Sequence, residues 1–509
     1  MSKHSASEKP VDSPALFESA ELGNSIDKKS FNQQAPEIRS KLLNAQKQLA
    51  GSDFSVVIIV SGVEGAGKPE TVNLLLEWMD ARGIETHAMW NPSDEELERP
   101  AAWRFWRVLP PKGRIGIFFG SWYTAPIINR VFERTSDAAF EQSLGDIVEL
   151  ERMLAKENVL LVKLWLHVSK KFQKHRLKEL ESDEKTRWRV NKMDWKFFKK
   201  YDTFRAISEQ ALLKTSMPEA PWHIIESCDE RYRYLTVTQT LLTALENRIA
   251  LSRNRSQEAA VRKPDLPKRP EISILSRLDM DLKLTKSEYE EKLLKYSGKF
   301  NLLTRQLYEK RRSLITVFEG ADAAGKGGAI RRLTAAMDAR IYQVISIAAP
   351  TDEERARPYL WRFWRHLPRL GRVTIYDRSW YGRVLVERIE GFCKTEDWQR
   401  AYAEINFFEE QIAKFGISIM KFWLAVTPGE QLRRFKDRQT TPYKQYKLTE
   451  EDWRNRAKSG AYEAAACEMI EKTSTPLAPW VLVESNDKYW ARIKVIKAVC
   501  AQLEQALDY

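Results

Sequence analysis

The residues from Gly320 to Gly328 have the composition of a phosphate-binding loop. They read Gly-Ala-Asp-Ala-Ala-Gly-Lys-Gly-Gly, follow a short apolar run and precede a helical pattern. Glycines let such a loop fold back so that backbone N–H groups point inward, and Lys326 adds a cation beside the positive end of the next helix. The segment therefore predicts phosphate binding, with an ordinary glycine turn as the alternative.

Two residues in this loop are unusual. Gly327 stands where Ser or Thr would supply a hydroxyl ligand for magnesium, and Asp322 places a carboxylate where it would repel phosphate. A carboxylate at that position makes sense if it holds the metal ion or orients the acceptor oxygen.

A second acidic motif follows a later apolar run, in Thr374–Arg383. Asp377 ends the expected strand, and ligands of open α/β sheets bind at that edge. Arg378 and Arg383 lie within reach of the same edge, so the motif supplies a metal ligand and cations for a migrating phosphoryl group. A local salt bridge between Asp377 and Arg378 is the alternative.

Basic residues gather again in Gln431–Arg438 and in the loop that follows. Arg434 and Arg438 are spaced to share a helix face, and Lys444 and Lys447 come next. A mobile basic segment of this kind could close over phosphates as a lid. A solvated basic helix face is the alternative.

These motifs need a framework of strands and helices to bring them together. Short apolar runs separated by longer amphipathic stretches predict a parallel sheet with helices on both faces. In the C-terminal half the expected strands are Ser313–Phe318, Val373–Tyr376, Ile417–Val426 and Trp480–Val483. The expected helices are Tyr289–Arg312, Ile330–Ala339, Trp398–Phe415, Gly429–Arg438 and Glu450–Thr473.

The same pattern occurs twice in the chain. Trp103 and Trp361 head matching Trp-Arg-Phe-Trp-Arg segments, 258 positions apart, and the same offset relates Lys68 to Lys326. The register holds without a gap across most of each half, which establishes an internal duplication. The aromatic segment itself is typical of packing, although Arg362 could contact phosphate or nucleotide.

The N-terminal copy lacks parts of the site. Glu64 stands opposite Asp322, and Pro69, which has no N–H, stands opposite Gly327. Phe119, Gly120, Ala125 and Leu180 stand opposite Asp377, Arg378, Arg383 and Arg438. We therefore expect this copy to be catalytically inactive, and either to pack against the active copy or to help bind a long anionic substrate.

The fold class predicted is α/β, with two tandem P-loop kinase-like domains, each a parallel sheet flanked by helices with a helical lid. We expect a flexible tail over 1–15, a degenerate domain over 16–250, a linker over 251–270 and a catalytic domain over 271–509.

Composition limits the class of protein. The chain of 509 residues is 43% hydrophobic and 30% charged, as expected for a globular protein. No apolar run is long enough to span a bilayer, and the first residues do not resemble a secretory signal. Four cysteines without framework spacing indicate reduced thiols and a cytoplasmic location. The net charge of +13 favours a polyanionic ligand without choosing one.

Three motifs in order give the C-terminal half a resemblance to the polyphosphate kinase 2 family. They are the Gly-x-Asp-x-x-Gly-Lys-Gly loop from Gly320, the Asp-Arg-Ser-Trp-Tyr-x-Arg motif from Asp377 and the Arg-Phe-x-x-Arg signature from Arg434. A fourth family element, Trp-Lys-Leu-Ser followed by Asp, reads Tyr446-Lys-Leu-Thr449 here. The two-copy layout is similar to the polyphosphate:AMP phosphotransferase branch of that family.

The resemblance implies that inorganic polyphosphate donates a phosphoryl group to AMP, giving ADP, with Mg²⁺ as cofactor. It implies no nucleic-acid or membrane partner and leaves a homo-oligomer open. The catalytic candidates are Asp322, Lys326, Asp377, Arg378 and Arg383, with Asp322 and Asp377 as metal ligands. The candidates for binding phosphate or nucleotide are Gly320, Ala323, Ala324, Gly325, Gly327, Gly328, Arg362, Arg434, Arg438, Lys444 and Lys447.

Three other functions stay open. An ATP-dependent nucleoside monophosphate kinase, similar to thymidylate kinases, would share the start of the loop and the Asp-Arg pair. A polyphosphate-dependent kinase acting on ADP or GDP would use the same motifs. A non-catalytic polyanion-binding protein would need the positive charge of the chain but not the carboxylates of Asp322 and Asp377.

Overall fold

Each half of the chain builds a five-stranded parallel sheet from its short apolar runs. The computed structural model describes residues 16–258, 267 and 273–508. These form two compact units. The first unit takes the described residues before Pro92, those from Val108 to Glu258, and Asp352–Tyr359. The second takes Pro92–Arg107, the other described residues up to Thr351, and those from Leu360 onward.

The sheet of the second unit has the strand order β10-β9-β6-β8-β7. Its strands are β6 (Ser313–Gly320), β7 (Tyr342–Ser346), β8 (Val373–Asp377), β9 (Ile417–Ala425) and β10 (Trp480–Glu484). The central strand β6 is buried over all but its last residue, because helices cover both of its faces. Phe318 of β6 pairs with Asp377 of β8, which brings the phosphate loop and the Asp377 motif to the same edge of the sheet.

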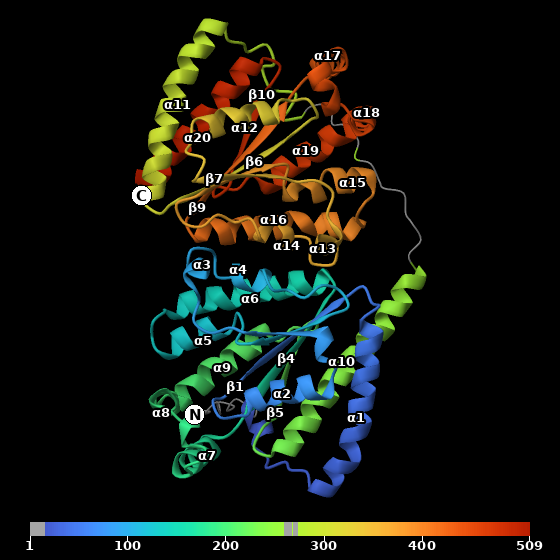
Figure 1. Cartoon of the computed structure of the whole chain (residues 1–509), viewed down its shortest axis with the longest axis vertical. Coiled ribbons are helices and arrows are strands. Elements are labelled where there is room, and N and C mark those ends of the chain that lie inside the picture. The colour runs from blue at the N-terminus through green and yellow to red at the C-terminus, as the bar shows by residue number, and fades with distance from the viewer. Residues whose placement is uncertain (1–15, 259–266, 268–272, 509) are drawn as a thin grey trace, which may run out of the picture. The chain divides into compact units, whose positions relative to one another are not determined.

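Helices lie on both sides of this sheet (Figure 1). On one side, α12 (Lys326–Ala335) and α20 (Lys488–Asp508) pack on the strands, with α11 (Lys286–Glu309) against α20. On the other, α16 (Thr395–Lys414) packs on β9 and on α19 (Ser459–Thr473). The expected lid comprises α17 (Pro428–Thr440), the 3-10 helix Pro442–Lys447 and α18 (Glu450–Ala457). Shorter elements of this unit are α14 (Trp361–Trp364), the 3-10 helix Trp380–Arg383 and α15 (Val386–Glu390), whereas α13 (Asp352–Arg355) belongs to the first unit.

The first unit repeats this arrangement with the strand order β2-β3-β1-β4-β5. Its strands are β1 (Ser55–Gly62), β2 (Ile84–Ala88), β3 (Ile115–Phe119), β4 (Val159–His167) and β5 (Trp222–Glu226). Its helices are α1 (Lys28–Leu49), α2 (Lys68–Trp78), α5 (Thr124–Val131), α6 (Asp137–Lys156), α7 (Lys170–Ser182), α8 (Lys192–Lys199), α9 (Tyr201–Thr215) and α10 (Glu230–Glu258). The short helices α3 (Asp94–Leu97) and α4 (Trp103–Trp106) belong to the second unit.

The predicted α/β class, the parallel sheets and the flanking helices are confirmed. Three element predictions were wrong. The helix expected over Ile330–Ala339 begins four residues earlier, at Lys326, and ends at Ala335. The helix expected over Glu450–Thr473 breaks at Lys458 into α18 and α19. The strand β7 was missed, because it is half-exposed at the edge of the sheet and lacks an apolar run.

Two of the expected regions fall largely outside the described residues. The predicted tail over 1–15 lies there entirely, and so does most of the predicted linker over 251–270. The described start of that linker continues helix α10 to Glu258. Among the described residues, no helix has both the length and the apolar character needed to cross a membrane.

Candidate active site

The phosphate loop turns sharply between β6 and α12. Gly320 has φ of 141°, and a Cβ there would lie 2.4 Å from the Leu424 carbonyl oxygen of β9, so only glycine fits. Gly325 begins α12 with φ of 108°. Ala323, at the bend between them, holds a positive φ of 60° despite its side chain. Such outliers are costly and gather at ligand-binding loops.

Lys326 lies at the start of α12, over the inside of this loop. Its ammonium donates to the carbonyl oxygens of Gly320 (2.7 Å) and Ala321 (3.3 Å). These contacts hold the amine at the loop without neutralising its charge. The charge is therefore available to an anion in the loop.

Asp322 is a partly buried carboxylate that contacts two other side chains. Its Oδ1 lies 3.2 Å from a guanidinium nitrogen of Arg378, and its Oδ2 accepts a 2.8 Å hydrogen bond from the Asn455 amide. Its side chain is 13% exposed. An ionised oxygen pair at this edge of the sheet is the donor set that a hard divalent cation prefers.

The turn after β8 carries Asp377 and Arg378. Arg378 adopts the left-handed region with φ of 64°, and its N–H donates to the Phe318 carbonyl oxygen of β6 (3.0 Å). The matching residue in the first unit is Gly120, where φ is 81° and a Cβ would lie 2.5 Å from the Met89 carbonyl oxygen. An arginine therefore holds the strained position in the second unit alone, which points to a use for its side chain.

Glu319 supports this turn from the end of β6. Its carboxylate accepts a 2.8 Å hydrogen bond from Ser379 Oγ, and Ser379 in turn accepts a 3.3 Å bond from the Tyr381 N–H. Burial raises the pKa of Glu319, while the charges of Lys326 and Arg378 oppose that rise. The sequence reasoning missed this residue, although the offset shows Ser61 in its place in the first copy.

A buried network beneath the turn is common to both units. Lys421 Nζ lies 2.7 Å from Glu409, which also accepts from Trp380 Nε1 (3.0 Å) and Tyr381 OH (2.7 Å). The first unit repeats it with Lys163 and Glu151, 2.6 Å apart. Because the network is also present in the copy that lacks counterparts of Asp377 and Arg378, it serves the fold rather than the chemistry.

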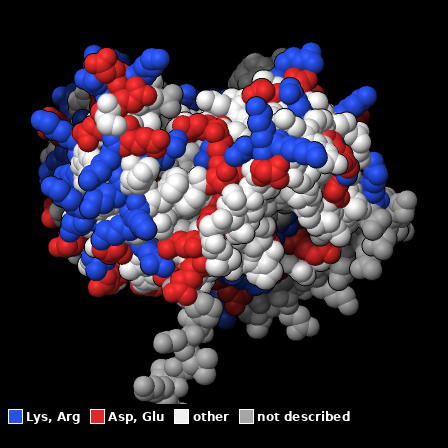
Figure 2. All heavy atoms as spheres, turned by 90° about the horizontal axis from the view of Figure 1, so that it is seen from below, with Lys and Arg blue, Asp and Glu red and all other residues white. Residues whose placement is uncertain are grey.

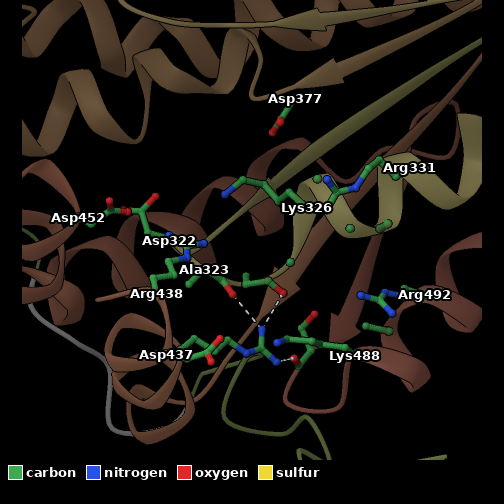
Figure 3. Close-up of a pocket in the computed structure, with 18 of the residues that line it drawn as sticks. Asp322, Ala323, Lys326, Arg331, Asp377, Asp437, Arg438, Asp452, Lys488 and Arg492 are labelled. Atoms are coloured by element: carbon green, nitrogen blue, oxygen red, sulfur yellow. Dashed lines mark hydrogen bonds between the residues drawn. The ribbon is translucent and has the colours of Figure 1, made fainter. Parts of the chain in front are cut away.

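Most of the residues predicted for the site border one cavity of about 890 Å³ (Figure 3). Asp322, Lys326, Asp377 and Arg378 all line it, so the loop and the second motif share a hollow. The other predicted residues on its wall are Ala323, Ala324, Gly325, Gly327, Gly328, Arg434 and Arg438.

Three cations on this wall were not predicted. They are Arg331 of α12 and Lys488 and Arg492 of α20. Figure 3 shows Arg331 and Arg492 across the cavity from Asp322. Two features of the sequence could have indicated them. Lys488 and Arg492 are four residues apart and so share a helix face, and the first copy has no cation at the three matching positions, which are Asn73, Glu230 and Tyr234.

Several predicted residues do not border the cavity. Arg383 pairs instead with Glu387 (3.0 Å) and Asp397 (3.8 Å). Arg362 donates to the Ala348 carbonyl oxygen (3.1 Å), and Gly320 acts through its backbone turn. The side chains of Lys444 and Lys447 lie outside the described residues. The functional roles of all these residues stay predictions.

Arg434 lines the cavity but is engaged with the loop itself. It is 3% exposed, and its guanidinium donates to the carbonyl oxygens of Ala323 (2.9 Å), Ala324 (3.2 Å) and Ser485 (2.5 Å). These contacts brace the loop against the end of β10. A direct contact of Arg434 with phosphate stays a prediction.

The phosphate loop of the first unit is occupied by its own side chains. Lys68 Nζ contacts Glu64 (3.1 Å) as well as the carbonyl oxygens of Gly62 (3.2 Å) and Val63 (3.0 Å). The charge of Lys68 lowers the pKa of Glu64. The Arg233 guanidinium also stands 2.4 Å from where a Cβ on Gly67 would lie. An incoming phosphate would have to displace the Glu64 carboxylate.

Asp322 and Asp377 are the predicted carboxylates on the cavity wall that could hold a metal ion, and Asp437 and Asp452 also line the cavity. Among the described residues no group of three or more His, Cys, Asp or Glu side chains forms a protein-only metal site. Two carboxylates beside a phosphate loop fit Mg²⁺, which usually takes its remaining ligands from water and substrate phosphates.

Comparisons with known proteins agree with this geometry. The family model described as polyphosphate kinase 2 matches residues 25–252 and again 283–508. A polyphosphate:AMP phosphotransferase of Pseudomonas aeruginosa is 50% identical over 96% of this chain and 99% of its own length. One of Acinetobacter johnsonii is 37% identical over 93% and 95%. A crystal structure described as a polyphosphate kinase 2 from Pseudomonas aeruginosa matches with a TM-score of 0.86 and 48% identity, covering 97% of this chain and 99% of that one. With both of its halves matched, the chain belongs to the polyphosphate kinase 2 family.

Proposed function

We propose that this protein transfers a phosphoryl group from inorganic polyphosphate to AMP, giving ADP, with Mg²⁺ as cofactor. The observation that carries the proposal is the charge of the cavity. Lys326, Arg378, Arg331, Lys488 and Arg492 border it, and only part of this charge is met by acids on the same wall. A chain of phosphates, with one negative charge or more on each unit, fits such a lining better than a nucleoside would.

The residues divide the work of phosphoryl transfer between them. This reaction needs positioned groups and electrostatic stabilisation rather than covalent catalysis by the protein. Lys326 and the loop N–H groups bind the transferred phosphoryl group, and Arg378 stabilises the charge that moves between donor and acceptor. Mg²⁺ held by Asp322 and Asp377 would neutralise phosphate oxygens. AMP is the proposed acceptor because the relatives matched over nearly the whole chain are named polyphosphate:AMP phosphotransferases.

The first unit has no catalytic part in this proposal, because its loop is neutralised by Glu64 and its second carboxylate is absent.

The four cysteines are free, which agrees with a reducing, cytoplasmic location.

The test compares donors and acceptors on the whole chain. ADP formation is measured with Mg²⁺ and AMP, using either long-chain polyphosphate or ATP as donor. ATP or GDP formation is then measured with polyphosphate and ADP or GMP. We expect polyphosphate with AMP to be the fastest pair, with loss of activity when EDTA removes the metal. Faster turnover with ATP would make the protein a nucleoside monophosphate kinase. Salt-sensitive polyphosphate binding without turnover would make it a polyanion-binding protein.

A further inference from the structure

A chain of hydrogen bonds connects the loop carboxylate to the lid. Asp322 Oδ2 accepts from Asn455 Nδ2 (2.8 Å), and Asn455 Oδ1 accepts from Tyr462 OH (3.2 Å). The Tyr462 oxygen also lies 3.3 Å from Glu390 Oε1. Asn455 is on α18, Tyr462 on α19 and Glu390 at the end of α15, so the hydrogen bonds link three helices, and Asn455 connects them to the Asp322 carboxylate.

The direction of these bonds follows from what each group can donate. An ionised carboxylate only accepts, so Asn455 must turn its NH₂ toward Asp322 and its carbonyl oxygen toward Tyr462. Burial and the nearby Glu390 charge raise the pKa of Tyr462, so its hydroxyl keeps its proton. The Tyr462 hydroxyl is placed to donate to Asn455 Oδ1 or to Glu390 Oε1, while Lys458 (2.9 Å) and Arg454 (3.3 Å) contact the other oxygen of Glu390, Oε2.

The first unit has the same fold but lacks these hydrogen bonds. At the offset of 258 residues, Asn455, Tyr462 and Glu390 become Phe197, Phe204 and Phe132. Phe132 and Phe197 pack edge to face with ring centroids 5.4 Å apart. The lid helices therefore pack against their unit through aromatic side chains, so packing alone does not require the three polar groups. They occur in the copy that keeps Asp322, Asp377 and Arg378.

We propose that Asn455 and Tyr462 are positioning residues that fix the Asp322 carboxylate when α18 is docked, and so couple the lid to the phosphate loop. A neutral amide suits this task. It orients one oxygen of Asp322 without cancelling the charge, and Arg378 contacts the other oxygen. The proposal rests on the proposed function and extends it to lid residues that neither the motifs nor the cavity lining identify.

The experiment uses the whole chain and the variants Asn455→Ala and Tyr462→Phe. We expect kcat to fall about tenfold to a hundredfold in Asn455→Ala, because misplacing a reacting group by about 1 Å can cost that much. A smaller fall is expected in Tyr462→Phe, and KM for AMP should change little in either. The matched control is Phe204→Tyr, which makes the reverse change at the equivalent position of the first unit and should keep the activity of the wild type.

A second measurement separates positioning from folding and needs no substrate. Hydrogen–deuterium exchange of the peptide that covers Glu450–Ala457 should speed up in both variants while the melting temperature of the protein stays the same. Unchanged kcat in both variants, or equal loss in Phe204→Tyr, would overturn the proposal. So would unchanged exchange in α18. If the wild type formed no ADP from polyphosphate, the proposed function would fail, but the exchange result would still decide the coupling of lid and loop.

Discussion

The two loop lysines have the same sequence position in each copy but different surroundings. Lys326 contacts carbonyl oxygens, whereas Lys68 also contacts the Glu64 carboxylate at 3.1 Å. In the first unit the carboxylate and the lysine neutralise each other, and Pro69 removes an N–H that could bind phosphate. The residue type alone therefore does not make a phosphate site, because the partner of the lysine decides whether its charge is available.

This difference predicts unequal effects of the same substitution. Lys326→Ala should lower kcat for ADP formation by about a hundredfold or more, since one lost group that stabilises transition-state charge costs that much. Lys68→Ala should keep most of the activity. Initial rates with saturating polyphosphate, AMP and Mg²⁺ measure both, with circular dichroism as the check of folding. An equal loss in the two variants would show that the first unit takes part in catalysis.

At the scale of elements, the sequence predicted the strands and the loop that have a local pattern of residues, and it missed features that arise only when helices and strands pack together. Apolar runs gave the central strands, and the glycine-rich loop gave Lys326 and Asp322. The edge strand β7 has no such run, and the break at Lys458 was missed although Ser459 and Gly460 follow it directly and weaken a helix there. Arg331, Lys488 and Arg492 were missed because they come from two helices more than 150 positions apart, which only the packing of α12 on α20 brings together.

The packing of these two helices extends the charge of the phosphate loop along one wall of the cavity. Lys488 lies one helical turn before Arg492 on α20, and Arg331 lies on α12. Burial lowers the pKa of Lys488, and the nearby charges of Arg434 and Arg433 lower it further. A phosphate chain would relieve this crowding of cations. The first unit has Glu230 and Tyr234 on the matching helix, hydrogen-bonded to each other at 2.6 Å.

Replacing the two α20 cations with the residues of the first copy tests the donor side of the site. The double variant Lys488→Glu/Arg492→Tyr should raise KM for polyphosphate about tenfold or more, because cations lost from an anion-binding cleft lower both attraction and association rate. KM for AMP should stay within about twofold, since the acceptor does not need this wall. Steady-state kinetics with each substrate varied in turn measure both. A rise in KM for AMP alone would place the acceptor there instead.

At the scale of the whole molecule, the positive charge is distributed unevenly. Figure 2 shows Lys and Arg side chains gathered over one part of the first unit, on the side where Figure 1 places α7 and α8. Lys171, Lys174 and Lys178 of α7 are exposed. The matching helix of the second unit is α17, whose Arg434 is buried against the loop. The degenerate copy thus lacks counterparts of Asp377 and Arg378 but carries a basic surface on α7.

A basic surface separate from the reacting end matters only for a long donor. The variant Lys171→Ser/Lys174→Ser/Lys178→Ser should raise KM for polyphosphate of several hundred units by about threefold to tenfold and leave KM for tripolyphosphate unchanged, since only a long chain has phosphates to spare for a second basic surface. The control removes the same charge from α1, as Lys28→Ser/Lys29→Ser/Lys47→Ser, and should affect neither donor. The effect should shrink as salt is raised from 50 to 300 mM, because exposed charges are screened over about 10 Å or less. If the two triple variants have the same effect on KM, polyphosphate binding depends on the net charge of the protein and not on the surface of α7. The first unit would then have a structural role alone.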